Sequence, residues 1–218
     1  TATSRTRYEA MLKDIENYKY DILIGTQLIS KGLDFQRVTL VGVIDADELL
    51  HFPNFRNHER CFNALQQLAG RSGRGGQVGK FLIQSKQVDH PVLEALVKNK
   101  RSDFINHENA VRLKYCYPPT YQFTIFEFSH KERKRAEDAA KYFALGLQQR
   151  LDKEFVLGPS LPPVERIRNT YRWEVVLKTP RDAVSAKRWR DAVVEVEQYR
   201  KAEHSIRSVR LRINVDAG

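Results

Sequence analysis

The chain has 218 residues, 41% of them hydrophobic and 29% charged, which is typical of a globular protein of one or two domains. No apolar run approaches the roughly 18 residues that cross a bilayer, so the composition excludes a membrane-spanning protein. The 37 Lys and Arg residues outnumber the 27 Asp and Glu residues, and the net charge of +10 favours polyanionic partners.

The first half of the chain alternates predicted helices with short apolar runs. A helix is predicted over residues 5–18, and the apolar runs at residues 21–26 and 39–44 are predicted to be buried parallel strands. A helix over residues 57–69 and a strand over residues 78–84 follow. The order α, β, β, α, β predicts an α/β fold with a parallel sheet.

Two further helices and a double proline come next. Asp89 is predicted to cap a helix with Pro91 in its first turn, and another helix is predicted over residues 102–114. Pro118 and Pro119 follow that helix and mark a domain boundary. The predicted organisation is an α/β domain over residues 1–88, a helical connector over 89–117 and a C-terminal domain over 118–218.

Beyond the double proline the predicted order changes to βαββαβ. Strands are predicted at residues 121–129, 172–178 and 209–215, with helices over residues 131–151 and 182–201. Two βαβ-like units with both helices on one sheet face predict a ferredoxin-like α+β domain.

Alternation along these strands predicts two unlike sheet faces. The apolar residues predicted to face the helices are Trp173, Val175, Leu177, Val209, Leu211, Ile213 and Val215. The cations predicted on the open face and the neighbouring extended segment are Arg166, Arg168, Arg172, Lys178, Arg210 and Arg212. Such cations would bind phosphates with salt-dependent affinity. A solvated face with Glu174 as a local counter-ion explains the same pattern equally well.

Two stretches of the first half combine glycines with polar residues. Residues 27–35 follow a predicted strand, and ligands of open α/β sheets gather at the carboxyl ends of strands. Residues 70–76 contain two arginines three positions apart between glycines, and their planar guanidinium groups can converge on one phosphate. A flexible basic turn is the plainer interpretation of the second stretch.

Together the stretches GTQLISKGLDF and QLAGRSGRGG resemble motifs V and VI of superfamily 2 helicases. The surrounding FPNFRNHER and LGPSLPPVERI segments resemble the primosomal protein N′ (PriA) family of replication-restart helicases. The resemblance runs nearly the whole length and implies a C-terminal fragment. It implies that residues 1–88 form part of a RecA-like lobe 2, and residues 118–218 a domain that binds DNA and partners.

In motif V the resemblance assigns two kinds of contact. Thr26 and Gln27 would face the tracked single strand of DNA. Gly32 would permit close backbone approach to the nucleotide, and Asp34 would lie toward it.

In motif VI the resemblance assigns the catalytic side chains. Gln67 would order the interface between the two motor lobes, while Arg71 and Arg74 would reach the ATP phosphates. Arg74 is the predicted arginine finger, which stabilises charge on the transferring phosphoryl group.

The chain lacks a Walker A loop in these residues. The segment GGQVGKF has Arg74 and Phe81 where that loop needs Gly and Ser or Thr. Asp45 and Asp47 imitate a Walker B pair, but a polar strand end is the expected interpretation because the family places this carboxylate in the other lobe. ATP and Mg²⁺ are therefore expected mainly on a first lobe that this sequence lacks.

Cysteine spacing bears on metal binding. Cys61 and Cys116 form no CxxC pair, which excludes a complete zinc ribbon within these residues. The resemblance implies zinc elsewhere in the full-length protein, and no metal site is predicted in this chain.

The resemblance implies an ATP-dependent 3′–5′ DNA helicase that restarts stalled forks by primosome assembly. The implied partners are single-stranded and forked DNA, the single-strand-binding protein and other primosome proteins, in the bacterial cytoplasm at the nucleoid and without membrane contact. These residues alone are predicted to be inactive as an ATPase. The alternative is a non-catalytic nucleic-acid or protein-binding module on a degenerate helicase-like scaffold.

Overall fold

The computed structural model describes residues 9–11, 13–15, 17–25, 38–73 and 78–216. It divides into two compact units, residues 1–104 and 105–218, each with its own hydrophobic core. The division lies within helix α6 (Arg101–Lys114), whose Phe104 stacks on Phe62 with ring centroids 4.5 Å apart. The predicted division into residues 1–88, 89–117 and 118–218 stays a prediction.

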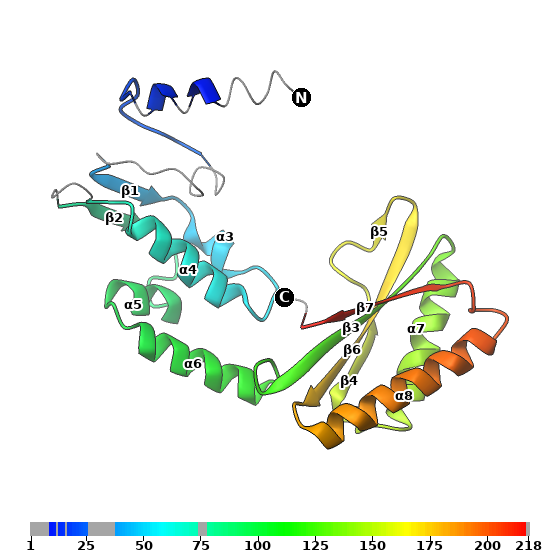
Figure 1. Cartoon of the computed structure of the whole chain (residues 1–218). Helices are drawn as coiled ribbons and strands as arrows, with labels where there is room; N and C mark the ends of the chain where they lie inside the picture. Colours follow the sequence, from blue (N-terminus) through cyan, green and yellow to red (C-terminus); the bar gives the residue numbers. More distant parts are fainter. Residues whose placement is uncertain (1–8, 12, 16, 26–37, 74–77, 217–218) are drawn as a thin grey trace. The chain divides into compact units, whose positions relative to one another are not determined.

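The first unit is built on a two-stranded parallel sheet (Figure 1). Strand β1 (Leu40–Val43) pairs with β2 (Lys80–Ile83), and helices α3 (Ala46–Leu50) and α4 (Asn57–Ala69) connect them. Helix α5 (Pro91–Val97) follows β2. The parallel pairing confirms the predicted α/β class, and α4 has the predicted bounds.

The two faces of this sheet have different surroundings. Phe81 and Ile83 pack against the core formed with α4 and α5. On the other face, Leu40 is 55% exposed and Leu82 is 59% exposed. Because parallel sheets are normally covered on both faces, this exposed apolar face is a distinctive feature of the unit.

The strand predicted over residues 21–26 is wrong where the structure describes it. Residues 21–25 have no regular structure, and Ile22 and Ile24 are 79% and 86% exposed. A strand needs a neighbour for its backbone N–H and C=O groups, and in the described part of the chain β1 and β2 pair only with each other. Residue 26 lies outside the described residues.

Two helix starts also differ from expectation. His90, not Asp89, caps α5, because its Nδ1 accepts a hydrogen bond from Val92 N at 3.2 Å. Pro91 lies in the first turn as predicted. The short helix α3 was not predicted, and it begins after Asp45, whose φ of 56° is left-handed.

The second unit contains an antiparallel sheet and two long helices (Figure 1). Its elements are β3 (Tyr121–His130), α7 (Arg133–Gln148), the 3-10 turn η1 (Lys153–Phe155), β4 (Val156–Ser160), β5 (Arg166–Ile167), β6 (Thr170–Pro180), α8 (Ala183–Ala202) and β7 (Arg210–Val215). The strand order is β4-β6-β3-β7, with the short β5 paired to β6. This order is that of the predicted ferredoxin-like βαββαβ sheet.

Helices α7 and α8 form the core with one face of this sheet. Phe126 and Phe128 of β3 pack around Phe143 of α7. A Cβ atom added to Gly146 would lie 2.8 Å from Cγ1 of Val196, so glycine permits close packing between α7 and α8. The helical stripe predicted on α7 is confirmed, since its members are buried: Ala136, Ala140, Phe143, Ala144 and Leu147.

Strand β7 only partly follows the predicted alternation. Val209 is buried and Leu211 packs against the core, but Ile213 and Val215 are about half exposed. Strand β7 forms one edge of the sheet, and only its first part reaches the core beneath the helices. Ile213 lies opposite Phe126 and Val215 opposite Thr124, so both are on the predicted face, but the helices do not cover them.

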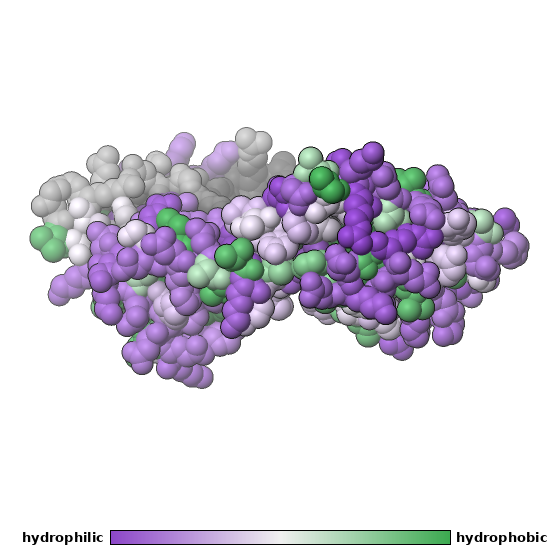
Figure 2. All heavy atoms as spheres, turned by 90° about the horizontal axis from the view of Figure 1, so that it is seen from below, coloured by the Kyte–Doolittle hydropathy of each residue, from purple (hydrophilic) through white to green (hydrophobic). Residues whose placement is uncertain are grey.

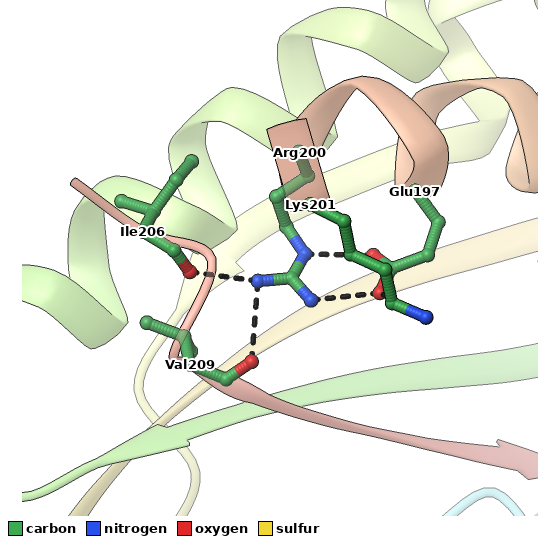
Figure 3. Close-up of polar contacts among 5 residues, drawn as sticks. All are labelled: Glu197, Arg200, Lys201, Ile206 and Val209. Carbon is green, nitrogen blue, oxygen red and sulfur yellow. Dashed lines mark hydrogen bonds and ion pairs between the residues drawn. The ribbon is translucent and has the colours of Figure 1, made fainter. Parts of the chain in front are cut away.

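A buried arginine fastens the turn that follows α8 (Figure 3). The Arg200 side chain is 2% exposed, and its guanidinium donates two hydrogen bonds to the carboxylate of Glu197. Nη1 also donates to the carbonyl oxygens of Ile206 at 2.9 Å and Val209 at 3.1 Å. These contacts bind the start of β7 to the end of α8.

Charged and polar residues dominate the face of the molecule shown in Figure 2, with apolar residues in small patches. Each unit keeps its largest apolar cluster in its own core. None of the helices in the described ranges is both long enough and apolar enough to cross a membrane.

Candidate functional site

The turn after α4 carries the residues of predicted motif VI. Gly70 N donates to Gln66 O at 3.0 Å, and Arg71 N donates to Leu68 O at 3.0 Å. The Ser72 hydroxyl donates to Ala69 O at 2.9 Å. These bonds hold the backbone that bears Arg71 against the last turn of the helix.

Gly73 attaches the same turn to the strands. Its N–H donates to Val38 O at 3.0 Å, and its φ of 79° lies in the left-handed region that favours glycine. A Cβ atom on Gly79 would lie 2.2 Å from Gly73 N, so the turn touches the backbone that enters β2. Arg71 is thus carried on a segment fixed to both a helix and the sheet.

The structure brings two predicted catalytic residues to one end of α4. Gln67 is exposed, and Arg71 follows it by four residues and is partly exposed. Gln67 lies in the last turn of α4, and Arg71 lies in the turn just beyond the C-cap Gly70. Their roles, and those of the predicted residues outside the described ranges, stay predictions: Thr26, Gln27, Gly32, Asp34 and Arg74.

The carboxylate of Asp47 joins the ends of the two parallel strands. It accepts hydrogen bonds from Lys86 N at 2.9 Å and from the Ser85 hydroxyl at 2.8 Å. These two bonds lower the pKa of Asp47. Asp45 precedes α3 and Asp47 lies in its first turn, and their interpretation as a polar strand end stays a prediction. The described residues contain no group of three or more His, Cys, Asp or Glu side chains that could hold a metal ion.

The loop before α4, part of the FPNFR element, is also ordered by polar contacts. Asn57 Nδ2 donates to the carbonyl oxygens of Leu49 and Leu50, each at 2.8 Å. Arg56 N donates to Asn54 Oδ1 at 2.8 Å. The beginning of α4, like its end, is held in place by hydrogen bonds.

The open face of the second sheet has mixed charge. Glu127 lies opposite Glu174 on one side and Arg212 on the other. Arg172 donates to the Glu127 carboxylate, and Arg212 Nη1 lies 3.9 Å from Glu127 Oε1. Sequence reasoning missed this buried carboxylate, although alternation with Phe126 and Phe128 places it outward. The predicted basic stripe is therefore interrupted.

Glu174 acts as a counter-ion on the same face. Its carboxylate lies 3.8 Å from Arg172, while partial burial raises its pKa. Arg172 and Arg212 are therefore both close to carboxylates. Charge on the middle of this face is largely compensated.

Lys178 packs against the segment that precedes β3. Its ammonium donates to Tyr115 O at 2.7 Å and lies 3.9 Å from the ring centroid of Tyr117. Partial burial lowers the pKa of Lys178. The tyrosine ring also lies 5.5 Å from that of Phe123. Lys178 therefore attaches the segment before β3 to β6.

The remaining cations predicted to contact DNA from the second unit are exposed. The guanidinium of Arg166 lies 4.9 Å from the ring centroid of Tyr171 and donates to Asn169 Oδ1. Arg168 lies at the turn between β5 and β6, and Arg210 begins β7. The structure thus separates the predicted cations into paired, structural and exposed groups.

Comparison with known protein families covers both units. The model of the primosomal protein N C-terminal domain matches residues 114–217. The model of the helicase conserved C-terminal domain matches residues 2–76. The helicase match includes both predicted motifs, V and VI, and the primosomal match covers nearly all of the predicted C-terminal domain.

Several relatives align with most of the chain. It is 38% identical to the replication restart protein PriA of Bacillus subtilis over 82% of the chain and 22% of that relative. The protein of the same name from Synechocystis is 34% identical over 83% of the chain and 22% of the relative. The Haemophilus influenzae protein is 32% identical over 99% of the chain, which spans 29% of its length. The chain therefore belongs to the PriA family of replication restart proteins.

Proposed function

We propose that this chain provides part of the second motor lobe and the C-terminal domain of an ATP-dependent 3′–5′ DNA helicase that restarts replication by primosome assembly. Its relatives are named replication restart proteins, and a helicase domain model matches the first unit. The observation that carries the proposal is Arg71, a partly exposed cation on a turn bonded to both α4 and Val38.

The fixed turn that carries Arg71 supports a role beside the phosphates of a nucleotide. A guanidinium on a fixed backbone can form charge-assisted hydrogen bonds to a phosphoryl group. ATP and Mg²⁺ would be held mainly by a first lobe, with zinc elsewhere in the complete protein. Arg71 and Arg74 would stabilise negative charge on the transferring phosphoryl group, and Gln67 would order the interface.

Motion would follow from a difference in contacts between two states. Arg71 and Arg74 would approach the phosphates only when the lobes close. Thr26 and Gln27 would hold the single strand, and closure would shift them along it, while Gly32 and Asp34 lie toward the nucleotide. A ligand shifts a conformational equilibrium only through such differential contacts.

The proposed partners are single-stranded and forked DNA, the single-strand-binding protein and other primosome proteins. The net charge of +10 is suited to a polyanionic partner. A protein of this function would act in the bacterial cytoplasm at the nucleoid.

The test replaces Arg71 and Arg74 separately by Ala in the complete protein. We expect DNA-stimulated ATPase activity to fall by roughly 10³-fold or more, as for arginine fingers elsewhere, with single-strand affinity changed less than about twofold. Lys98→Ala is the control, because this exposed lysine at the end of α5 forms an ion pair with Glu94 at 3.0 Å and should leave activity unchanged when removed.

Two results would contradict the proposal. Unchanged ATPase activity in both arginine variants would remove the motor role of the turn. Robust ATP turnover by the purified 218-residue chain would show that no other lobe is needed. A complete protein without any ATPase activity would instead favour the non-catalytic scaffold.

A further inference from the structure

Strand β7 leaves one edge of the second sheet open (Figure 1). It pairs with β3 on one side, and no strand of the described ranges pairs with its other side. A free strand edge is a template for pairing with another chain, and proteins often protect it with proline or a bulge. At the opposite edge, Pro159 lies in β4 and the register is irregular between Leu157 and Ser160. The six residues of β7 include no proline and pair with β3 in an unbroken register.

The hydrogen bonds to β3 identify which backbone groups of β7 remain free. Asp216 N, just after the strand, donates to Phe123 O at 2.6 Å, so these two residues occupy a hydrogen-bonded position. Hydrogen-bonded and non-hydrogen-bonded positions alternate along an antiparallel pair. The register therefore makes Arg210, Arg212 and Asn214 the other hydrogen-bonded positions. The residues between them direct their backbone N–H and C=O groups away from β3, where a further strand could bind: Leu211, Ile213 and Val215.

Polar contacts hold both ends of β7 in place. The Asp216 carboxylate accepts a hydrogen bond from Phe123 N at 3.0 Å and another from Arg181. At the other end, the buried Arg200 donates to Val209 O at 3.1 Å, just before the strand begins. A strand that is already ordered loses little conformational entropy when a peptide pairs with it, so this edge is preorganised for binding.

The side chains of β7 indicate what kind of peptide would fit. On the helix side of the sheet, Ile213 and Val215 are about half exposed. On the open side, Arg210 is exposed, and the Arg212 side chain is 56% exposed although it lies 3.9 Å from Glu127. Directly opposite residues of paired strands have their side chains on the same face. An added strand would therefore place apolar residues beside the first pair and acidic residues beside the arginines.

We propose that the free edge of β7 binds an extended segment of a partner protein in which acidic and apolar residues alternate. Backbone hydrogen bonds to Leu211, Ile213 and Val215 provide the affinity, and the two unlike faces select the alternating pattern. A second copy of this chain is a poorer occupant, because two molecules that each carry a net charge of +10 repel one another. Binding at this edge requires neither ATP nor DNA, so it goes beyond the proposed motor function.

The experiment titrates the 218-residue chain into three fluorescein-labelled eight-residue peptides and follows fluorescence anisotropy. One peptide alternates Glu and Val, the second alternates Lys and Val, and the third has four Glu followed by four Val. Ile213→Pro removes an outward N–H group, whereas Ile213→Ala keeps that group and shortens the side chain. Val194→Ala is the matched control, because it shortens an exposed apolar side chain on α8. Hydrogen exchange, followed by nuclear magnetic resonance, measures the backbone amides of β7 in the unchanged chain.

We expect the alternating Glu-Val peptide to bind roughly tenfold more tightly than the other two, and Ile213→Pro to weaken it by roughly tenfold. Ile213→Ala should weaken it by about threefold, and Val194→Ala by less than about twofold. The bound peptide should slow exchange of the Leu211, Ile213 and Val215 amides.

Three results would overturn the proposal. They are equal affinity for all three peptides, unchanged exchange of the β7 amides at saturating peptide, or a dimer in sedimentation that Ile213→Pro abolishes. The last result would make a second copy the occupant. Because the exchange measurement uses the unchanged chain, it decides even where a variant fails to fold.

Discussion

Arg200 and Glu197 lie three residues apart on α8 and form two hydrogen bonds, Nε to Oε2 and Nη2 to Oε1, each at 2.7 Å. The carboxylate neutralises a guanidinium that is almost fully removed from water. The remaining N–H groups satisfy two backbone carbonyl oxygens of the turn before β7. One ion pair therefore allows a charged side chain to hold a buried turn.

Arg200→Met should destabilise the second unit. The change leaves the carbonyl oxygens of Ile206 and Val209 without this donor and the Glu197 charge without its partner. Removing one member of a buried pair costs about 3–5 kcal/mol in free energy of unfolding. Urea denaturation followed by circular dichroism measures the loss. Lys201→Met, at a side chain that is 68% exposed, is the control, and an equal loss in both variants would contradict the argument.

Gly146→Ala should also be destabilising, although Ala normally favours a helix by about 1 kcal/mol over Gly. Its Cβ atom would lie 2.8 Å from Val196 Cγ1, and overpacking of this kind costs about 1–3 kcal/mol. Adding Val196→Ala to Gly146→Ala should recover part of the lost free energy of unfolding, because it removes the methyl groups that the new Cβ atom would meet. A double-mutant cycle in urea should therefore give a favourable coupling energy between the two substitutions. If Gly146→Ala alone increased the free energy of unfolding, the overpacking argument would be wrong, because α7 and α8 could then move apart at little cost.

Cys61 should react slowly with thiol reagents in the folded protein. It is buried in the first core, and burial raises its pKa to about 11. Because the thiolate is the nucleophile, little reactive form exists at neutral pH. Iodoacetamide labelling followed by peptide mass spectrometry should modify Cys61 much faster after addition of urea. Rapid labelling of Cys61 without denaturant would contradict its burial.

Asp182 should stabilise α8 in a pH-dependent way. The hydroxyl and backbone N–H of Ser185 hydrogen-bond its carboxylate and lower its pKa, and the N–H bond is 2.8 Å long. A carboxyl group with a lowered pKa in the folded state stabilises the fold above pH about 4, and this contribution is lost as pH falls through the folded value. Asp182→Ala should therefore lower stability at pH 7.

The stability difference between wild type and Asp182→Ala should shrink at pH 3, as measured by urea denaturation at both pH values. Asp182→Asn is the matched control, because Asn caps helices without titrating. A difference that stays constant between pH 7 and pH 3 would mean that the charge of the cap is irrelevant.

The paired cations in the middle of the open sheet face should contribute less to DNA affinity than Arg210 at the start of β7. Arg172 and Arg212 are held by Glu127, whereas Arg210 has no carboxylate partner among the described residues. Arg212→Gln should therefore reduce duplex affinity and the salt slope less than Arg210→Gln. Fluorescence anisotropy across a salt series compares them, and a larger effect of Arg212→Gln would reverse the order of importance.

Much of the second unit could be predicted from sequence because its apolar periods are long. The repeats on α7 and α8 and the alternation along β6 each extend over several turns or residue pairs, so the βαββαβ order follows from them. The end of β7 could not be predicted in this way. Alternation identifies two faces, but it does not indicate how far the helices extend over an edge strand.

The first unit shows the limit of short patterns. The apolar run at residues 21–25 has the composition of a strand, yet pairing depends on a neighbour that no local pattern specifies. The helix α4 was predicted with its observed bounds because it has a helical period between a polar loop and Gly70. Sequence alone could not distinguish Asp89 from His90 as the cap of α5, because either side chain can accept a hydrogen bond from an N–H group in the first turn of the helix.

The predicted site was only partly visible in the sequence for a similar reason. Motif spacing located Gln67 and Arg71 on one helix end, and the structure shows how the turn is fixed. The ion pairs of Glu127 depend on the strand register between β3, β6 and β7. A count of outward cations cannot reveal such compensation, because the carboxylate lies on a different strand.

The exposed apolar residues on one face of the β1–β2 sheet should affect how molecules of this chain associate in solution. Leu40 and Leu82 expose apolar surface, while the net charge of +10 makes neighbouring molecules repel one another. Raising ionic strength shortens the Debye length, which is about 8 Å at 0.15 M, and so weakens that repulsion without weakening hydrophobic attraction. Concentrated solutions of this polypeptide should therefore stay clear at low ionic strength and become turbid as salt is added.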